Sequence, residues 1–368
     1  MSSDPMLAAL FYATFFAIAV CFSVLINFLI LRFSRNLGMR NIRNNQFGGM
    51  RWGSTSKPSV GGFSFYIIFL ISISVLGVIP VEDQGYFNKQ LIGLLVACSM
   101  GFLLGLADDA YNTNPLVKFI GQFTCANLLV ATNFQIAVTP LPEINYIITV
   151  LWVIGLMNSI NMLDNMDAIT ASVSVCIILG AIALIILNGD IDNVYLIIML
   201  GVLGALTGFL FFNWHPSKIY MGDTGSQFLG VFLAAISILF FWNYRESYTG
   251  FIELRQFLIP MLLFIIPLID TTTVVIRRLA RRQSPFVGGK DHITHQLAYL
   301  GLSDRWVAIV LSLVSLVSVF LVVFIYTNLG NWHARMTFLT LGYFALVFIV
   351  FQILYDMGRR KHEQRPKS

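Results

Sequence analysis

The amino-acid sequence predicts an all-α fold, a polytopic membrane bundle of about eleven transmembrane helices. Three observations predict it. Hydrophobic residues make up 57% of the 368 residues and charged residues only 11%, whereas charged residues are roughly a quarter of an average soluble domain. Apolar runs of about 18 to 25 residues, long enough to cross about 30 Å of hydrocarbon as helices, recur along the chain. Lys and Arg gather in alternate connections between these runs.

The apolar runs define the predicted spans in chain order. They cover residues 7–31, 59–80, 91–107, 116–138, 144–161, 169–187, 193–213, 225–242, 256–276, 305–327 and 335–357. Two of these spans need an independent test, because the third run is short and the fourth contains Lys118. The placement of charged residues provides that test. All but four of the 23 Lys and Arg residues fall on one side of the predicted membrane, in the connections, at the span ends that adjoin them, or in the C-terminal tail. The positive-inside rule therefore predicts the N-terminus outside and the C-terminus in the cytoplasm.

The connections predict a single transmembrane domain, residues 1–357, followed by a basic cytoplasmic tail, 358–368. The outer connections are short and leave no room for an external domain. Two inward loops, 32–58 and 277–304, are long enough to fold over a site, and the second is predicted to continue the ninth helix as far as Pro285. The basic tail favours an anchor to anionic lipid over nucleic-acid binding.

Five aspartates mark the candidate site. Each lies at the edge of an apolar run on the predicted cytoplasmic side: Asp108, Asp109, Asp164, Asp167 and Asp223. A carboxylate at the centre of a membrane helix costs about 2.5 to 3.5 kcal/mol on insertion scales, so acids grouped at span ends usually mark an ion, a substrate or a metal. The placement indicates catalysis at a membrane surface.

The first two motifs are acidic helix ends. Asp108 and Asp109 point about 100° apart on a helix, so they suit two different roles, one at a metal and one at a nucleophile; a charged cap is the structural alternative. The second motif is a run of polar residues at intervals of three, which only a helix end or a 3₁₀ turn would gather on one side. Its members are Asn158, Asn161, Asp164 and Asp167.

The third and fourth motifs suit phosphate. Residues 220–226 place glycines on both sides of Asp223 before a new helix, which leaves backbone N–H groups open to phosphate; an ordinary N-cap is the alternative. His292 and His295 form an i,i+3 pair. Zinc lacks a third ligand nearby, so phosphate contact is favoured over zinc, with a structural pair also open.

The carboxylate-rich ligand set favours a hard octahedral ion, Mg²⁺ or Mn²⁺, that bridges substrate phosphates. Acids, metal, basic loops and a lipid-embedded scaffold together indicate phosphoryl transfer to a lipid. The competing class is an ion-coupled secondary transporter, which requires acids in mid-span. Asp270, inside the ninth span, is the one acid that suits it, and we expect Asp270 instead to pair with an Asn or Arg in helix packing.

Five motifs in order make the sequence resemble the polyprenyl-phosphate N-acetylhexosamine-1-phosphate transferase family. The resemblance covers residues 57–302 and looks closest to the undecaprenyl-phosphate GlcNAc-1-phosphate transferase branch. The motifs are Lys57-Pro58-x-x-Gly61-Gly62, Leu106-Ala107-Asp108-Asp109 with Lys118 and Gln122, Asn158-x-x-Asn161-x-x-Asp164-x-x-Asp167, Asn213-x-x-Pro216-x-Lys218-Ile219-Tyr220-Met221-Gly222-Asp223-Thr224-Gly225-Ser226, and Asp291-His292-x-x-His295.

The resemblance implies a magnesium-dependent enzyme that transfers a sugar-1-phosphate, expected to be GlcNAc-1-phosphate, from a UDP-sugar to undecaprenyl phosphate. UMP is released, in the first membrane step of cell-surface polysaccharide synthesis on the cytoplasmic face of a bacterial inner membrane. The phospho-MurNAc-pentapeptide transferase of peptidoglycan synthesis is the alternative within the family. The expected partners are the two substrates and membrane lipids; a homodimer stays open, and nucleic acid is not expected.

The resemblance also implies residue roles. Asp223 and Asp109 would hold the metal, and Asp108 and Asp109 would bind or deprotonate the lipid phosphate. The substrate-binding residues would be Lys57, Lys118, Asn158, Asn161 and Tyr220, with Tyr220 stacked on uracil. Catalytic roles would also fall to Asp164, Asp167, His292 and His295.

Five positions depart from the family pattern. Asn112 stands where this branch often has a third acid, Asn165 and Ala168 replace glycines, and Thr294 and Gln296 leave two histidines where relatives show more. These departures leave the reaction class intact and make the sugar and the loop geometry uncertain.

Overall fold

The structure is a computed structural model, and its description is confined to residues 5–34, 57–76, 88–191, 193–243, 254–284, 289–328, 330 and 332–364. This part of the chain contains no β-strand, only one isolated bridge between Ser59 and Tyr220. Its helices are α1 (Pro5–Ser34), α2 (Gly62–Leu76), α3 (Lys89–Tyr111), α4 (Pro115–Ala131), α5 (Pro142–Leu163), α6 (Ile169–Leu187), α7 (Val194–Asn213), α8 (Gly222–Ser237), η1 (Ile238–Trp242), α9 (Leu254–Leu263), α10 (Ile265–Ala280), α11 (Ile293–Leu300), α12 (Asp304–Thr327) and α13 (Ala334–Glu363).

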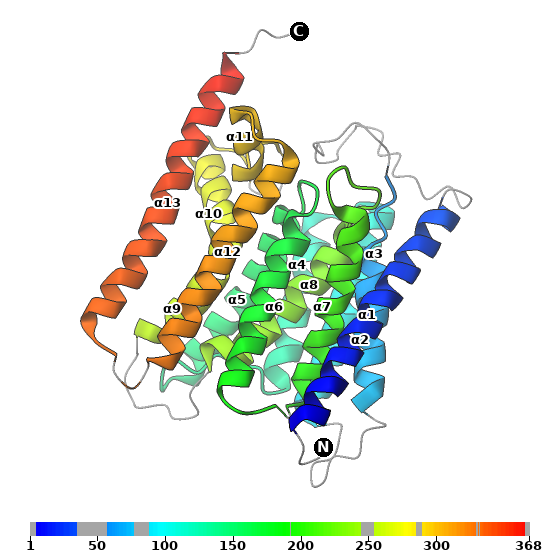
Figure 1. Cartoon of the computed structure of the whole chain (residues 1–368). Coiled ribbons are helices and arrows are strands. Elements are labelled where there is room, and N and C mark those ends of the chain that lie inside the picture. The colour runs from blue at the N-terminus through cyan, green and yellow to red at the C-terminus, as the bar shows by residue number, and fades with distance from the viewer. Residues whose placement is uncertain are drawn as a thin grey trace.

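The all-α membrane fold predicted from composition is confirmed. Among the described residues, eight helices are long and apolar enough to span a membrane, and the bent pair α9–α10 would make a ninth. The helices α2 and α4 are apolar but shorter. Each of the eleven predicted spans thus contains a helix, while the count of eleven crossings and the orientation of the termini stay predictions. The N-terminal end of α1 and the C-terminal end of α13 lie at opposite ends of the bundle (Figure 1).

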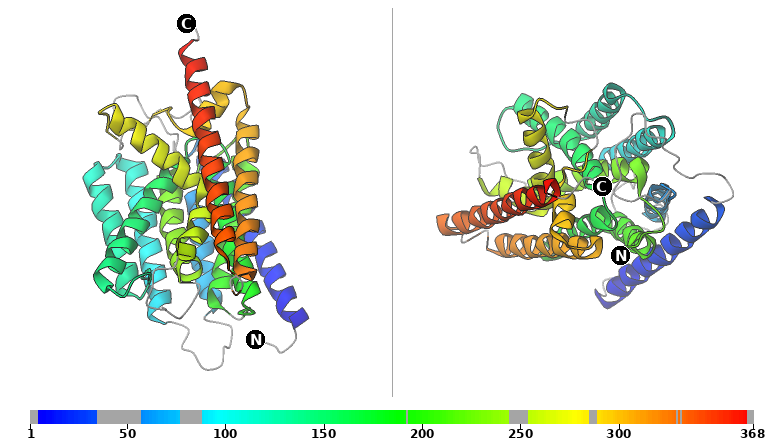
Figure 2. Two further views of the ribbon diagram at one scale, coloured as in Figure 1. Left: turned by 90° about the vertical axis from the view of Figure 1, so that its left-hand side faces the viewer. Right: turned by 90° about the horizontal axis from the view of Figure 1, so that it is seen from above.

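The helix α8 forms the centre of the bundle, packed against α3, α5 and α2. Almost every residue of α8 after its first turn is buried, whereas α1 and α13 lie at opposite edges and expose apolar side chains (Figure 2). Small residues allow the inner helices to approach closely. A Cβ atom at Gly105 of α3 would lie 2.2 Å from the carbonyl oxygen of Asp223, and one at Gly230 would lie 2.6 Å from the Cα of Met157. Gly101 and Gly105 thus lie where α3 packs closely against α8.

The ninth predicted span is broken. Its two helices, α9 and α10, meet at Phe264 with a bend of 82°, so the prediction of one continuous helix over residues 256–276 was wrong. Proline has no N–H and its ring clashes with the carbonyl four residues earlier. Pro267, in the first turn of α10, therefore prevents the α-helical hydrogen bond to Leu263, where α9 ends. α10 then ends at Ala280, and the predicted break at Pro285 lies outside the described residues.

Candidate active site

The start of α8 is locked to the start of α2 by backbone hydrogen bonds. Tyr220 N–H donates to the Pro58 carbonyl (2.9 Å), and Gly61 N–H donates to the Tyr220 carbonyl (3.0 Å). A Cβ at Gly62 would lie 2.3 Å from the backbone nitrogen of Gly225, so only glycine permits this approach. Two motifs separated by about 160 residues in sequence therefore form one rigid unit at the end of the bundle that also holds the C-terminal end of α3.

Asp109, near the end of α3, caps the start of α8. Its Oδ2 accepts hydrogen bonds from the backbone N–H of Thr224 (2.8 Å) and from the Thr224 hydroxyl (2.7 Å). A carboxylate in this position satisfies an N–H group that has no partner within the helix and complements the positive end of the helix dipole. The contact also fixes the distance between Asp109 and the neighbouring Asp223. One of the two oxygens of Asp109 is thus occupied by the helix.

Lys118 connects the first two acidic motifs. Its Nζ donates to Asp108 Oδ2 (2.8 Å) and to Asn161 Oδ1 (3.1 Å). The Nδ2 of Asn161 in turn donates to Asp223 Oδ1 (2.7 Å) and to the hydroxyl of Ser226 (2.8 Å). Side chains from α3, α4, α5 and α8 therefore form one continuous polar network. The structure thus joins at least one residue from each of the first three motifs, namely Asp108, Asn161 and Asp223.

This network carries an excess of negative charge. The carboxyl groups of Asp108 and Asp223 are in hydrogen-bond contact with each other, and Asp109 adds its charge to Asp223. Two carboxyl groups can share such a contact only with a proton or a cation between them. Lys118 is the one ammonium group bonded to this cluster in the described chain. The donor set is all oxygen and therefore fits a hard divalent cation such as Mg²⁺, with Asp223, Asp109 and Asp108 as the residues that would hold it.

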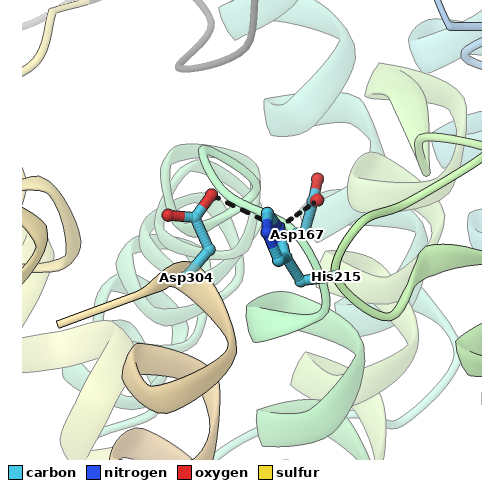
Figure 3. A group of neighbouring side chains, drawn as sticks. All are labelled: Asp167, His215 and Asp304. Carbon is cyan, nitrogen blue, oxygen red and sulfur yellow. Dashed lines mark hydrogen bonds and ion pairs between the residues drawn. The ribbon is translucent and has the colours of Figure 1, made fainter.

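A second cluster surrounds Asp167. Its Oδ1 accepts from the Ser217 hydroxyl (2.7 Å), and its Oδ2 from Ser217 N–H (3.0 Å). The Nδ1 of His215 lies 3.0 Å from Oδ2 of Asp167 and 3.6 Å from Oδ2 of Asp304. Figure 3 shows His215 lying between the two acids. Lys57 reaches the same place, 3.0 Å from the Ser217 hydroxyl and with its ammonium 5.1 Å from the centre of the Tyr220 ring.

Asp167, His215 and Asp304 have ligand atoms close enough for a metal ion, but their hydrogen bonds fit a cation poorly. Both oxygens of Asp167 already accept hydrogen bonds, and the Lys57 ammonium lies 3.9 Å away. Two carboxyl groups, those of Asp167 and Asp304, share this ammonium, whereas three carboxyl groups share Lys118 in the aspartate network, so the network has the larger excess of negative charge to attract a divalent cation. The group is better described as a clamp that fixes His215 and Lys57 beside Tyr220, and the aspartate network around Lys118 is the better metal site.

Sequence reasoning missed His215 and Asp304. His215 lies inside the fourth motif of the resemblance, next to Pro216. It could have been singled out there, because it is a titratable residue in the same motif as Asp223. Asp304 begins α12, where an acid ordinarily complements the helix dipole. Nothing in its sequence context separates it from that role.

Asn158 and Asp164 are the first and third members of the second motif. Asn158 exchanges hydrogen bonds with Gln122 (2.8 and 3.2 Å), which also donates to Gln227 (3.2 Å). This amide network lies one turn further from the helix end than Asn161, so the structure places Asn158 in helix packing beside the site. Asp164 is half-buried where α5 ends. Asn161, Asp164 and Asp167 lie at or just beyond the end of α5, and Asn161 and Asp167 take part in two different clusters.

The two histidines lie on or beside the short helix α11. Nδ1 of His292 lies 2.7 Å from Asp270 Oδ2, and Ile293 N–H donates to Asp270 Oδ1 (2.8 Å). The expectation that Asp270 pairs with an Asn or Arg was wrong: α10, after its bend from α9, carries this carboxylate to the start of α11. His295 is fully buried. Burial, assisted by the charge of His292, lowers the pKa of His295 to about 3, so its imidazole is neutral at pH 7.

The segment before α11 is fixed by an ion pair. Arg278, itself buried, donates through Nε to Asp291 Oδ2 (2.7 Å) and through Nη2 to Oδ1. Partial burial would raise the pKa of Asp291, but the hydrogen bond and charge of Arg278 outweigh it and hold that pKa below its ordinary value. Thr294 then donates to Asn165 Oδ1 (2.7 Å). This contact joins α11 to the turn that carries Asp164 and Asp167.

Comparison with known proteins supports the motif assignment. Residues 91–241 match the model of glycosyl transferase family 4. The chain is 32% identical over 269 residues to a probable undecaprenyl-phosphate N-acetylglucosaminyl 1-phosphate transferase of Bacillus subtilis, covering 71% of each chain. It is 28% identical over 284 residues to a decaprenyl-phosphate N-acetylglucosaminephosphotransferase of Mycobacterium leprae, covering 70% of this chain and 71% of that one.

A phospho-N-acetylmuramoyl-pentapeptide-transferase of Oceanobacillus iheyensis is also 32% identical, but over 243 residues, 60% of this chain and 73% of that one. The matched region contains α3 to α8 and therefore the whole aspartate network. The aspartate network, the helical membrane fold and the relatives all indicate the same family. The chain, a multi-pass membrane protein, therefore belongs to glycosyl transferase family 4, the family of polyprenyl-phosphate N-acetylhexosamine-1-phosphate transferases.

Proposed function

We propose that the protein transfers GlcNAc-1-phosphate from UDP-GlcNAc to undecaprenyl phosphate and releases UMP. The observation that carries the proposal is the network of Asp108, Lys118, Asn161 and Asp223, which joins three separate motifs at one end of the bundle. The names of two relatives that match about 70% of this chain, both N-acetylglucosamine phosphotransferases, support this choice of sugar. The relative acting on a muramoyl-pentapeptide matches a smaller share of this chain.

The proposed reaction is one displacement at phosphorus. An oxygen of the lipid phosphate attacks the phosphorus that carries the sugar, the bond from that phosphorus to the bridging oxygen breaks, and UMP leaves with that oxygen. Such reactions depend mainly on positioning and on charge stabilisation. Mg²⁺, when bound, would neutralise charge on the diphosphate and polarise the phosphorus–oxygen bonds. Asp223 and Asp109 would hold it, and Mn²⁺ would suit the same oxygen ligands.

The acceptor would lie beside Asp108 and Asp109. Lys118 offers its positive charge to the lipid phosphate while it remains bonded to Asp108 and Asn161. Asp108 and Asp109 would bind the acceptor through the metal and receive the proton that a monoprotonated phosphate carries. The hydrogen bond from Thr224 N–H to Asp109 joins the end of α3 to the start of α8, and so fixes the position of the acceptor site relative to the metal site.

The nucleotide would lie beside the Asp167 clamp. Tyr220 is half-buried and offers a ring face for uracil, while Lys57 supplies a positive charge next to it. His215, Ser217 and Asp167 hold that lysine in place. Asp164 borders the same turn, and His292, oriented by Asp270, would contact the phosphate or sugar. His295 is buried behind His292, so its proposed contribution is through His292.

We further propose that the enzyme resides in a bacterial cytoplasmic membrane with its site on the cytoplasmic face. The Lys and Arg distribution supports this orientation. The aspartate network lies at the C-terminal end of α3, in the half of the bundle that also holds the C-terminus of the chain (Figure 1). A UDP-sugar made in the cytosol and a lipid phosphate could meet there. Residues 1–357 are proposed as a single catalytic domain, although α13 continues as a helix to Glu363.

The test is UMP release by purified protein in detergent with Mg²⁺, undecaprenyl phosphate and a panel of UDP-sugars that includes UDP-GlcNAc and UDP-MurNAc-pentapeptide. We expect UDP-GlcNAc to be the substrate, and Asp223→Asn to abolish release while size-exclusion behaviour and thermal melting are retained. Asp190→Asn, an exposed acid in the connection after α6, is the matched control and should keep full activity. No UMP from any donor would refute the enzyme, and full activity of Asp223→Asn would refute the metal assignment alone.

A further inference from the structure

The last helix, α13, contacts the rest of the protein in an unusual way. It is 30 residues long, but its buried residues are only Thr340, Phe351, Tyr355 and Gly358. The last three follow one another at spacings of four and three, so they share one face of the helix. The protein contacts of α13 are thus concentrated in its C-terminal half, and most of its remaining surface is apolar and exposed.

That half of α13 is anchored to α10 by a group of contacts around Arg277. The guanidinium donates to Asp356 (2.9 Å) and to Gln352 (3.0 Å) and lies 4.1 Å from the ring centre of Tyr355. Gln352 in turn donates to the hydroxyl of Thr273 (2.6 Å). Charge, hydrogen bonds and a cation–π contact together fix the rotation and height of α13 against α10.

The following turns of α13 lie directly on α11. A Cβ at Gly358 would lie 2.4 Å from the carbonyl oxygen of Gln296, so the two helix backbones touch. Lys361 donates to the carbonyl of Leu300 at the end of α11 (2.9 Å). The rings of Tyr299 and His362 stack with centres 4.0 Å apart and planes 12° apart. These contacts cover the side of α11 that faces away from the bundle core.

α11 needs such support. It has eight residues, and isolated helices shorter than about 12 to 15 residues are marginal even in favourable sequences. On its inner side it is held by Asp270, through His292 and Ile293, and by the bond from Thr294 to Asn165. The position of the two histidines therefore depends on α11 being pressed against these inner partners from outside.

We propose that the C-terminal end of α13, residues 358–362, is a brace that positions α11, and that Gly358 and His362 are positioning residues for the transfer reaction. Neither residue lies near the aspartate network, and both act through α11 and the histidines it orients. The effect on turnover rests on the proposed function. The effect on the order of α11 does not, so the two can be tested separately.

The first experiment compares Gly358→Ala with Gly342→Ala in the full-length protein. Gly342 lies in the same helix and has no atom within 4 Å of the place that a Cβ would take, so an added methyl group is tolerated there. For Gly358→Ala we expect turnover to fall by about tenfold to a hundredfold, because small misplacements of catalytic groups have effects of that size. The KM for UDP-GlcNAc should change by less than about threefold, because the residue touches no proposed nucleotide contact. Gly342→Ala should match the wild type.

The second experiment measures backbone hydrogen exchange in residues 293–300, which requires no activity. Gly358→Ala and His362→Ala should both accelerate exchange there and leave α3 and α8 unchanged, and His362→Phe, which keeps an aromatic ring for the stack, should restore protection. His362 is exposed, so its variants test the brace even if Gly358→Ala does not fold. Unchanged exchange in His362→Ala would overturn the brace. Faster exchange with unchanged turnover would overturn the positioning role, and a wild type that releases no UMP would refute the proposed function while leaving the exchange result valid.

Discussion

Asp270 offers a direct test of how the fold orients a histidine. It is 2% exposed, and its two oxygens serve different donors, His292 Nδ1 (2.7 Å) and Ile293 N–H (2.8 Å). In Asp270→Asn the remaining carbonyl oxygen can still accept from Ile293, which keeps the start of α11 in place. The new amide N–H group then faces His292 Nδ1. The imidazole must accept there and carry its proton on Nε2, which reverses the tautomer that the carboxylate favours.

The expected loss follows from the bond that is removed. A hydrogen bond to a charged group contributes about 1.5 to 3 kcal/mol, and every 1.36 kcal/mol is a factor of about ten in rate. Turnover in UMP release should therefore fall by about tenfold to about 150-fold, with a thermal melt that shows the protein folded. Glu143→Gln, an exposed acid in the first turn of α5, is the control and should retain wild-type turnover. If Asp270→Asn turns over within about twofold of wild type, His292 has no role that depends on its tautomer or charge.

Three further predictions concern the site and its surroundings. Burial, and secondarily the charge of His292, lower the pKa of His295 from its ordinary value of 6.5 to about 3. Below pH 6.5 the unfolded chain therefore binds a proton at His295 that the folded protein does not bind. The free energy of unfolding should fall by about 1.4 kcal/mol between pH 7.5 and pH 5.5. In thermal melts His295→Asn should lessen this acid sensitivity, and exposed His333→Asn should not. Ala168 has φ of 65°, so Ala168→Gly should raise the melting temperature through relief of about 1 kcal/mol of strain; a lower one contradicts this. In Gly105→Ala the added methyl group would clash with the Asp223 carbonyl. The free energy of unfolding should fall by about 1 to 3 kcal/mol, and most of the UMP release should be lost. Gly155→Ala, where the methyl group enters open space, should change neither the stability nor the UMP release.

The membrane helices were predictable because lipid removes the alternatives. A chain segment in hydrocarbon must satisfy its own backbone hydrogen bonds, so an apolar run of sufficient length forms a helix whatever its neighbours are. The break at Phe264 was not predicted, because the length and apolar composition of a run do not record the backbone hydrogen bond that a proline removes. Asp270 of α10 bonds to His292 and Ile293 at the start of α11, and such contacts depend on the tertiary arrangement rather than on the local sequence.

The aspartate network was predictable for a related reason. Asp108, Asp109, Asn161 and Asp223 all follow or begin apolar runs, so alternation of the spans puts them at the same end of the bundle. Their partners were harder to predict. The partners of Lys118, Asp108 and Asn161, can be predicted only when the relative positions of α3, α4 and α5 are known. The pairing of His215 with Asp304 spans 89 positions in sequence and depends on where α12 starts, which no local pattern records.

The departures from the family pattern show what a single sequence can and cannot convey. Asn165 and Thr294 were each singled out as unusual, and the structure shows that they bond to each other (2.7 Å). Asn112 ends α3 in the left-handed region, with φ of 50°, a conformation that asparagine tolerates better than an ordinary side chain. Ala168 takes a similar conformation without that advantage, which is the reason a glycine suits this position. The bond between Asn165 and Thr294 therefore ties the turn beside Asp167 to α11 and holds the loop geometry that the departures made uncertain.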